Sequence, residues 1–350
     1  MQLENHLILE DTLIKEALLK INKIGNPDLL TLFVVDSENK LLGSLTDGDI
    51  RRGLINGIDI GNSIKKVYHK DVKYVVDDKS PDYEKMNYLR SEKVKLVPLV
   101  NKQNQILKLL DFSVQKVILP IDAVIMAGGL GSRLKPLTDS TPKPLLKVGD
   151  KEIIAHNFDR LYQFGVTNQF VTVNYLGEQI VSFCKSYKKE INFNLIQEKE
   201  YYGTAGALSL INDFQNDTIL LMNSDLLTNI DYEDFYKSFI DKEADIMVAS
   251  VPYQVSLPYG IFKEENRKVL SFEEKPNYTY YANAGIYLIK KSLLKLVPEN
   301  EFFNATDLLE IIINSNKKLI HYPIRSYWLD IGKHEDYKKA QNDILHIDFD

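Results

Sequence analysis

A glycine-rich turn flanked by cations is the stretch of this sequence best suited to chemistry. Its residues are Ala127, Gly128, Gly129, Gly131, Ser132 and Arg133. Glycine readily takes positive φ, so such a turn can direct backbone N–H groups at one phosphate chain. Arg133 would add a fixed positive charge, and Lys143, held between two prolines, could aim a second cation at the same ligand. For three glycines alone, an ordinary turn between a strand and a helix is an equal alternative.

The elements that must position this turn alternate between strand and helix. Apolar runs predict strands at residues 121–126, 169–173, 193–197, 218–222, 246–250, 284–289 and 319–323. Helical spacing lies between several of them, at residues 153–164 and 176–189, and we expect a further helix to begin after the glycine-rich turn. Alternation across residues 119–350 predicts one α/β domain with a mainly parallel, mixed sheet. Such sheets bind ligands beyond the carboxyl ends of their strands.

Residues 1–118 contain an internal repeat. The strand-turn-strand pattern around Asn39 returns 65 residues later around Asn104, and each copy is preceded by apolar residues at helical spacing. The two copies cover about residues 1–65 and 66–118. We therefore expect a smaller α+β domain of paired repeats, joined to the larger domain by a short linker at residues 115–120.

Composition limits the kind of protein. Hydrophobic residues make up 44% of the chain and charged residues 26%, which is typical of a soluble globular protein. The net charge of −6 gives no support for binding to nucleic acid or to an anionic membrane. Cys184 is the only cysteine, which excludes an intramolecular disulfide and fits a reducing cytoplasm. The first residues lack a signal-peptide pattern, and no apolar run approaches transmembrane length, so we expect a cytoplasmic protein.

The string G-G-L-G-S-R-L-K-P-L-T, followed by P-K-P, resembles the signature of the sugar-1-phosphate nucleotidyltransferases. It has neither the spacing of the dinucleotide-binding fingerprint nor that of the Walker loop. The resemblance implies a Rossmann-like, GT-A-like sheet and the reaction of a nucleoside triphosphate with a sugar 1-phosphate. It further implies that the turn, with Gly203 and Thr204 of a later G-T-A string, binds the nucleotide. Arg133 would then hold the triphosphate, and Lys143 the attacking phosphate.

Glu198 stands five residues before Gly203, where uridylyl- and thymidylyltransferases of the family usually have a glutamine. An ionised carboxylate only accepts hydrogen bonds. Guanine offers it two neighbouring donors, whereas uracil and thymine offer one donor flanked by acceptors. Glu198 therefore favours GTP, unless it points to solvent and backbone groups read the base.

Two aspartates match the metal ligands of the family. Asp225 closely follows the apolar run at residues 218–222, with Ser224 in place of the usual glycine, and Asp330 lies in W-L-D-I-G-K-H-E-D-Y. Either aspartate alone would more often be a cap or turn residue. Two carboxylates together with phosphate oxygens and waters suit Mg²⁺, so the resemblance implies a magnesium ion as cofactor.

Three further strings resemble the sugar side of the family site. Tyr259-Gly260, the string F-E-E-K-P and the string N-A-G-I-Y imply sugar or phosphate contacts from Gly260, Glu274, Lys275 and Asn283. Glu273 beside Glu274 leaves the register uncertain by one position. Tyr278, Tyr280 and Tyr281 would either close over the sugar or line a surface loop. A solvated turn is the alternative for E-E-K-P.

The repeat unit resembles the CBS module, in which T-x-x-D closes a strand and opens a helix. Thr46 and Asp49 match this pattern, whereas Asp111 and Val114 at the same positions of the second copy do not. The resemblance implies at most one conventional site for an adenine nucleotide, with the threonine near phosphate and the aspartate on ribose. Capping of the following helix is an equal alternative.

Taken together, the motifs favour an enzyme that joins GTP to an amino-sugar 1-phosphate and releases pyrophosphate. The arrangement is similar to that of bacterial guanylyltransferases that make GDP-glucosamine for legionaminic acid. Within the same class, the sugar could be mannose or heptose, or the nucleotide UTP or dTTP. Outside enzymes, an inactive nucleotide-sensing subunit is the alternative, although Arg133, Lys143, Asp225 and Asp330 are all present. The repeat pair would sense a nucleotide and regulate the enzyme, or tie protomers into a dimer, and we expect a homo-oligomer.

Overall fold

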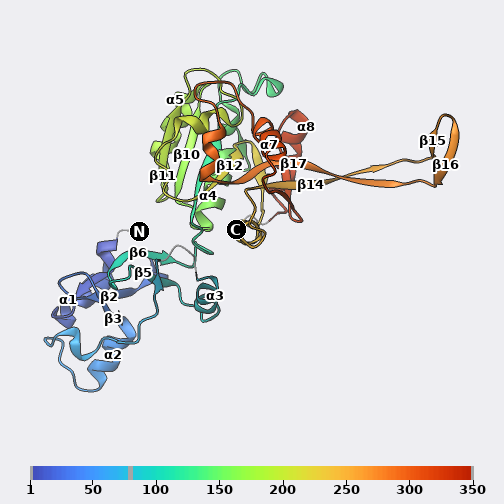
Figure 1. Ribbon diagram of the computed structural model, residues 1–350. Helices are drawn as coiled ribbons and strands as arrows, with labels where there is room; N and C mark the ends of the chain where they lie inside the picture. Colours follow the sequence, from blue (N-terminus) through green and yellow to red (C-terminus); the bar gives the residue numbers. More distant parts are fainter. Residues whose placement is uncertain (1–2, 78–81, 348–350) are drawn as a thin grey trace. The chain divides into compact units, whose positions relative to one another are not determined.

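The computed structural model describes residues 3–77 and 82–347, and the chain divides into two compact units at Pro120 and Ile121 (Figure 1). Unit 1 precedes this boundary and unit 2 follows it. No helix within the described residues is long and apolar enough to cross a membrane. Because the placement of the units relative to each other is not determined, each is described by itself.

Unit 1 holds two three-stranded sheets with the orders β1-β2-β3 and β4-β5-β6. Its elements are β1 (Leu7–Leu9), α1 (Ile14–Asn22), β2 (Thr31–Val35), β3 (Leu41–Thr46), α2 (Asp47–Ile55), β4 (Val75–Val76), α3 (Tyr83–Ser91), β5 (Leu96–Val100) and β6 (Ile106–Asp111). In each sheet the first pair of strands is parallel and the second pair antiparallel. Phe33 of β2 and Val100 of β5 belong to one buried cluster, so the two sheets share a hydrophobic core.

The hairpin turns of the two sheets bind each other reciprocally. Asn39 and Asn104 both take positive φ, at 63° and 62°. The side-chain amide of Asn39 donates to the carbonyl of Ile106 at 3.1 Å, and that of Asn104 donates to the carbonyl of Leu41 at 2.8 Å. The backbone N–H groups of Leu41 and Ile106 return hydrogen bonds to the carbonyls of Asn104 and Asn39. Equivalent residues of the two copies thus make equivalent contacts.

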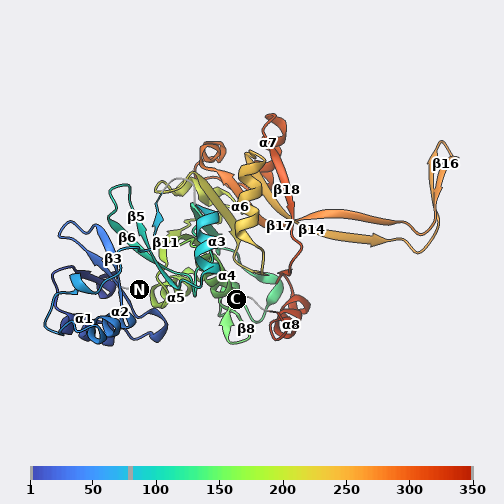
Figure 2. The same ribbon diagram turned by 90° about the horizontal axis from the view of Figure 1, so that it is seen from below.

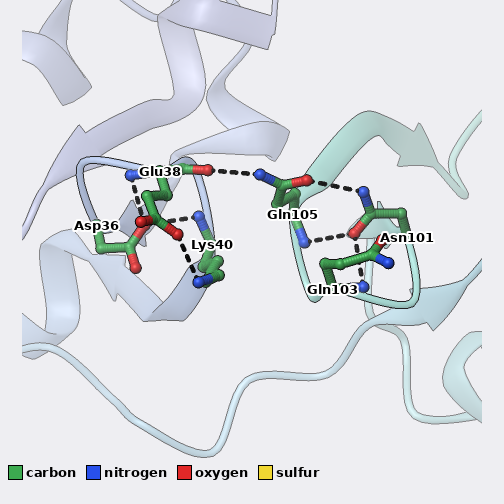
Figure 3. Close-up of polar contacts among 6 residues, drawn as sticks. All are labelled: Asp36, Glu38, Lys40, Asn101, Gln103 and Gln105. Carbon is green, nitrogen blue, oxygen red and sulfur yellow. Dashed lines mark hydrogen bonds and ion pairs between the residues drawn. The ribbon is translucent and has the colours of Figure 1, made fainter.

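The same equivalence extends through both turns (Figure 3). Asp36 and Asn101 hold the same position, and Oδ1 of each accepts the N–H groups of the residues two and four places later, at 2.9 to 3.0 Å. Between the turns, the side-chain amide of Gln105 donates to the carbonyl of Glu38 at 2.9 Å. A side-chain oxygen at this position stabilises each turn by satisfying N–H groups that the hairpin leaves unpaired.

Unit 2 is built on a seven-stranded sheet of order β11-β10-β7-β12-β17-β14-β18. Its elements are β7 (Ile121–Met126), β8 (Lys147–Val148), β9 (Lys151–Glu152), α4 (Ile153–Gln163), β10 (Asn168–Val173), α5 (Gly177–Ser186), β11 (Asn192–Gln197), β12 (Thr218–Asn223), β13 (Leu226–Thr228), α6 (Tyr232–Asp241), β14 (Ile246–Ser256), β15 (Ile261–Glu265), β16 (Lys268–Glu273), β17 (Asn277–Lys290), α7 (Ala305–Asn314), β18 (Leu319–Pro323), β19 (Trp328–Asp330) and α8 (His334–Asp343). Only β17 runs antiparallel to its neighbours in this sheet. The predicted mainly parallel, mixed sheet is therefore confirmed.

Two strands of this sheet are much longer than the sequence predicted. Beyond Ser250 and Asn283, β14 and β17 leave the sheet as a two-stranded ribbon that ends in the hairpin of β15 and β16. Figures 1 and 2 show this ribbon projecting from the sheet of unit 2. We call residues 251–282 the arm. The apolar runs at residues 246–250 and 284–289 marked only the buried halves of the strands, because the outer halves lie in solvent and need no continuous apolar run.

The helix expected after the glycine-rich turn is absent, and that prediction is wrong. The described chain forms only a 3₁₀ turn at Ser132–Leu134, and Lys135 already has extended dihedrals. Pro136 follows directly, and a proline lacks the N–H group that a continuing helix would require.

Candidate active site at the carboxyl edge of the sheet

Three chain segments that leave the carboxyl ends of neighbouring strands lie side by side. The N–H of Ala127 donates to the carbonyl of Thr172 at 3.0 Å, and that of Ser224 donates to Met126 at 3.2 Å. One strand further along, the N–H of Glu198 donates to the carbonyl of Val173 at 2.9 Å. The parallel order β11-β10-β7-β12 thus brings the glycine-rich turn, Glu198 and the start of the Asp225 segment to one edge.

The glycine-rich turn packs closely against the segment that carries Lys143. Gly131 has a φ of 61°, and a Cβ on it would lie 3.0 Å from Cβ of Lys143 and 3.1 Å from Cγ2 of Thr138. The hydroxyl of Thr138 donates to the carbonyl of Gly131 at 2.9 Å. A Cβ on Gly129 would meet nothing within 4 Å, so the backbone there is open to a ligand. The turn is therefore fixed on one side and accessible on the other.

The two aspartates lie together where β13 pairs with β19. Asp330 is the cross-strand neighbour of Leu226, and the N–H of Ile331 donates to the carbonyl of Asp225 at 3.1 Å. The ammonium of Lys143, a buried residue, forms an ion pair with Asp225. Residues from three distant parts of the sequence thus form one charged cluster.

Arg133 lies on the other side of the same cluster. A Cβ on Gly332 would lie 3.4 Å from a terminal nitrogen of its guanidinium, so the guanidinium lies beside the backbone two residues after Asp330. Burial and the charge of Asp225 raise the pKa of Asp330, and the positive charges of Lys143 and Arg133 only partly oppose this effect.

This cluster fits a divalent metal ion. Oδ1 of Asp225 and Oδ1 of Asp330 are both buried, and neither has a hydrogen-bond partner within residues 3–77 and 82–347. Carboxylate oxygens are the ligands that Mg²⁺ prefers, together with water and phosphate oxygens. Two carboxylates leave the other coordination positions of an octahedral ion to water and phosphate oxygens.

Glu198 is buried and faces the glycine-rich turn. It is 3% exposed, so the alternative in which it points to solvent is wrong. Its Oε2 accepts the N–H of Tyr202 at 3.1 Å, and a Cβ on Gly128 would lie 2.8 Å from its Oε1. Burial raises the pKa of Glu198, and hydrogen bonds from Tyr202 and Thr172 oppose this effect. Glycine at position 128 thus leaves space for a carboxyl group to approach the turn.

The G-T-A segment is held by contacts within the protein. Gly203 has a φ of 79°, and a Cβ there would lie 2.7 Å from the carbonyl oxygen of Phe303. The hydroxyl of Thr204 accepts the N–H of Ala305, the first residue of α7, at 2.9 Å. These contacts explain both residue types without a ligand, and a role for them in nucleotide binding stays a prediction.

Asn283 is the one sugar-side residue that the structure places close to the end of β12. Its side chain accepts the N–H of Gly285 at 2.9 Å and donates to the hydroxyl of Tyr287 at 2.8 Å. Gly285 has a φ of 72°, and a Cβ there would lie 2.6 Å from the side-chain nitrogen of Asn223. Asn223 is two residues before Asp225, so Asn283 lies at the foot of the arm beside the charged cluster.

Gly260, Glu274 and Lys275 lie on the arm, and the structure does not bring them to Asp225 (Figures 1 and 2). Oε2 of Glu274 would be 3.0 Å from a Cβ on Gly260. Glu273 instead forms an ion pair with Lys263 and accepts the hydroxyl of Tyr278 at 2.9 Å. Of the two neighbouring glutamates, Glu274 is thus the one whose side chain lies beside Gly260.

Sequence reasoning missed two residues near the charged cluster. Asn223 touches Gly285, and its signal was a polar residue at the very end of an apolar strand. Tyr201 is 47% exposed, and its pKa is raised by burial and by the charges of Glu198 and Asp225. It therefore lies within electrostatic reach of both carboxylates, which no local pattern indicated.

In unit 1, Thr46 and Asp49 form a capping box at the start of α2. Oδ2 of Asp49 accepts the N–H of Thr46 at 2.8 Å and its hydroxyl at 2.6 Å, and Arg52 donates to Oδ1 of Asp49 at 2.5 Å. The capping alternative therefore describes the contacts of both side chains in this structure. A nucleotide-binding role for them stays a prediction.

Comparison with known proteins shows which family the chain belongs to. Residues 122–347 match the family model described as nucleotidyl transferase, and the chain belongs to this family. Among curated proteins it is 33% identical over 226 residues to "Probable mannose-1-phosphate guanylyltransferase 1" of Oryza sativa subsp. japonica. It is 32% identical over 228 residues to "Mannose-1-phosphate guanyltransferase" of Schizosaccharomyces pombe. Each match covers 61% of this chain and 62% of the relative, so the chain spans less than two thirds of the length of these relatives.

Two solved structures resemble about two thirds of this chain. A putative glucose-1-phosphate thymidylyltransferase from Bacillus anthracis, in complex with a sucrose, is 27% identical with a TM-score of 0.53, over 66% of this chain and 97% of that chain. HddC from Yersinia pseudotuberculosis, complexed with GMP-PN, is 26% identical with a TM-score of 0.51, over 64% of this chain and 99% of that chain.

Proposed function

We propose that this chain is a sugar-1-phosphate nucleotidyltransferase, which converts a nucleoside triphosphate and a sugar 1-phosphate to a nucleotide sugar and pyrophosphate. The observation that carries the proposal is the meeting of the glycine-rich turn, two cations and two aspartates at the carboxyl edge of the sheet, within the residues that match the family. Sheets of this kind bind ligands at that edge.

In this reaction a phosphate oxygen of the sugar phosphate attacks the α-phosphorus, and the bond from that phosphorus to the pyrophosphate oxygen breaks. The attacking group is already an anion, so no side chain has to activate it. Catalysis then depends on positioning and on neutralising charge. Arg133 would hold the triphosphate against the open face of the turn at Gly129, and Lys143 would hold the attacking phosphate. Asp225 and Asp330 would hold Mg²⁺, which when bound neutralises charge on the α-phosphate and the leaving pyrophosphate.

The proposed nucleotide is GTP. Its support is the buried carboxyl of Glu198 facing Gly128, since guanine presents two donors to such a group. The relatives named as guanylyltransferases agree with this choice. The structural relative from Bacillus anthracis, described as a putative thymidylyltransferase, keeps dTTP or UTP as the second candidate.

The proposed sugar is glucosamine 1-phosphate, for legionaminic acid or another surface glycan. Its support is the combination of a nucleotidyltransferase unit with a preceding pair of repeats, which we interpret as a CBS pair that binds an adenine nucleotide. Mannose 1-phosphate, named for the curated relatives, is the main alternative, and a heptose 1-phosphate is another.

Pyrophosphate release tests the proposal. The purified chain with Mg²⁺ is offered GTP, UTP, dTTP, CTP and ATP, each with the 1-phosphates of glucosamine, N-acetylglucosamine, mannose and glucose. Release with GTP and glucosamine 1-phosphate is the expected result, and release with UTP or dTTP alone would refute the choice of base. No release with any pair, with and without added AMP or ATP, would favour an inactive regulatory subunit.

A further inference from the structure

The arm exposes an unusual number of large apolar side chains. They are Tyr253, Tyr259, Phe262, Val269, Leu270, Phe272, Tyr280 and Tyr281, each between 51% and 75% exposed. The rings of Phe262 and Phe272 pack on each other, 5.5 Å between centroids, yet both remain more than half exposed. Within the described residues, the strands of the arm pair only with each other. An isolated two-stranded ribbon is only marginally stable in water, and an apolar surface of this kind marks a contact site.

The same arm carries three residues of the proposed site. Glu274 lies beside Gly260, and Lys275 follows directly, so three of the four residues that match the sugar-side strings lie together on the arm. The body of unit 2 keeps the cations and carboxylates proposed to hold the phosphates and the metal ion, including Lys143 and Asp225. The body of a single chain therefore lacks most of the residues that match the sugar-side strings.

The arm of a chain does not fold back onto its own body. Cross-strand pairs run without a register shift from Ser250 and Asn283 to Ser256 and Asn277, and the N–H of Leu257 continues the ladder to Pro276. At ~3.3 Å per residue, the stretch from Ser250 to Gly260 spans roughly 30 Å. The ladder holds Gly260 and Lys275 out on the arm, away from the charged cluster of their own chain.

We propose that the arm of one chain enters the active site of a second copy and supplies Gly260, Glu274 and Lys275 to it, in a reciprocal exchange. This inference rests on the proposed function. A closed two-fold dimer satisfies both partners at once, because each copy donates an arm and receives one. The exchange covers the exposed aromatic side chains and places the Lys275 ammonium where a sugar phosphate needs a cation.

Complementation between two inactive chains tests the exchange. One chain carries Lys275→Ala on the arm, the other carries Asp225→Asn in the body, and the two are co-expressed with different tags and purified through both tags in sequence. Each mixed dimer then contains one intact body that receives one intact arm, so half of the wild-type activity per dimer is expected. An arm that serves its own chain gives no recovery, and this result would overturn the proposal. Full activity of Lys275→Ala alone would also overturn it.

In a matched control, one chain carries Asp225→Asn and the other carries Asp330→Asn. Both changes lie in the body, so the mixed dimer should show no recovery of activity. If the wild-type chain releases no pyrophosphate with any substrate pair, the proposed function fails, and the exchange is judged without activity. For that purpose, Leu130→Cys, on the exposed part of the glycine-rich turn, and Lys275→Cys are placed in separate, differently tagged chains that also carry Cys184→Ala. A short bismaleimide should join the two chains. Absence of the joined product from folded protein would refute the exchange.

Discussion

Replacing Glu198 with glutamine is the most direct test of how the base is chosen. The oxygen that accepts the N–H of Tyr202 can be kept by the amide oxygen of glutamine, and the amide nitrogen then takes the place of Oε1 beside Gly128. Guanine would thus meet a donor where it had met a charged acceptor. A hydrogen bond to a charged group contributes about 1.5–3 kcal/mol, and an opposed donor adds to its loss.

We therefore expect Glu198→Gln to raise the barrier with GTP by about 2–4 kcal/mol, a fall in kcat/KM of roughly 30- to 900-fold. With UTP the change should stay within about threefold, because uracil offers an acceptor to the new amide nitrogen. The assay is pyrophosphate release at limiting nucleotide, with one sugar phosphate held constant.

Glu200→Gln is the matched control, since Glu200 lies two residues away and is exposed. It should leave kcat/KM for both nucleotides unchanged. An equal loss with GTP and UTP in Glu198→Gln would mean that the carboxyl group only supports the local fold. No loss with GTP would mean that backbone groups read the base. Either result would refute the reasoning from Glu198.

Three further outcomes follow from the structure. Burial raises the pKa of Glu198 above 4.5, so just above that pH the folded chain keeps a proton that the unfolded chain has lost. The Tm of the wild type should therefore fall relative to the Tm of Glu198→Gln as the pH rises from 4.5 through the raised pKa. Mg²⁺ at 100 times its Kd should stabilise the wild type by about 2.7 kcal/mol, and thermal melts should show less stabilisation in Asp330→Asn. Asp122 is fully buried and accepts the N–H groups of Gln215 and Asn216 at 2.6 and 2.9 Å. Urea titrations of Asp122→Ala should therefore show a free energy of unfolding lower by about 3–5 kcal/mol. A loss below about 1 kcal/mol would contradict this role.

The sequence by itself determined the buried halves of the strands in the large sheet. Apolar runs such as that of β7 are a local signal, because a strand covered on both faces needs an apolar residue at nearly every position. Residue types and spacing also identified the glycine-rich turn and both aspartates. The position of Lys143 between two prolines predicted a directed cation, and the structure pairs it with Asp225.

Only the tertiary structure decided what these residues face. Glu198 could have pointed to solvent, and burial against Gly128 depends on a turn distant in sequence. The glycine at position 203 is required by the carbonyl of Phe303, a contact that no local pattern contains. The arm was missed for the same reason, since a ribbon in solvent has no apolar periodicity to mark it. Local periodicity reports whether a segment is buried, whereas the partner that buries it is set by packing between segments far apart in the chain.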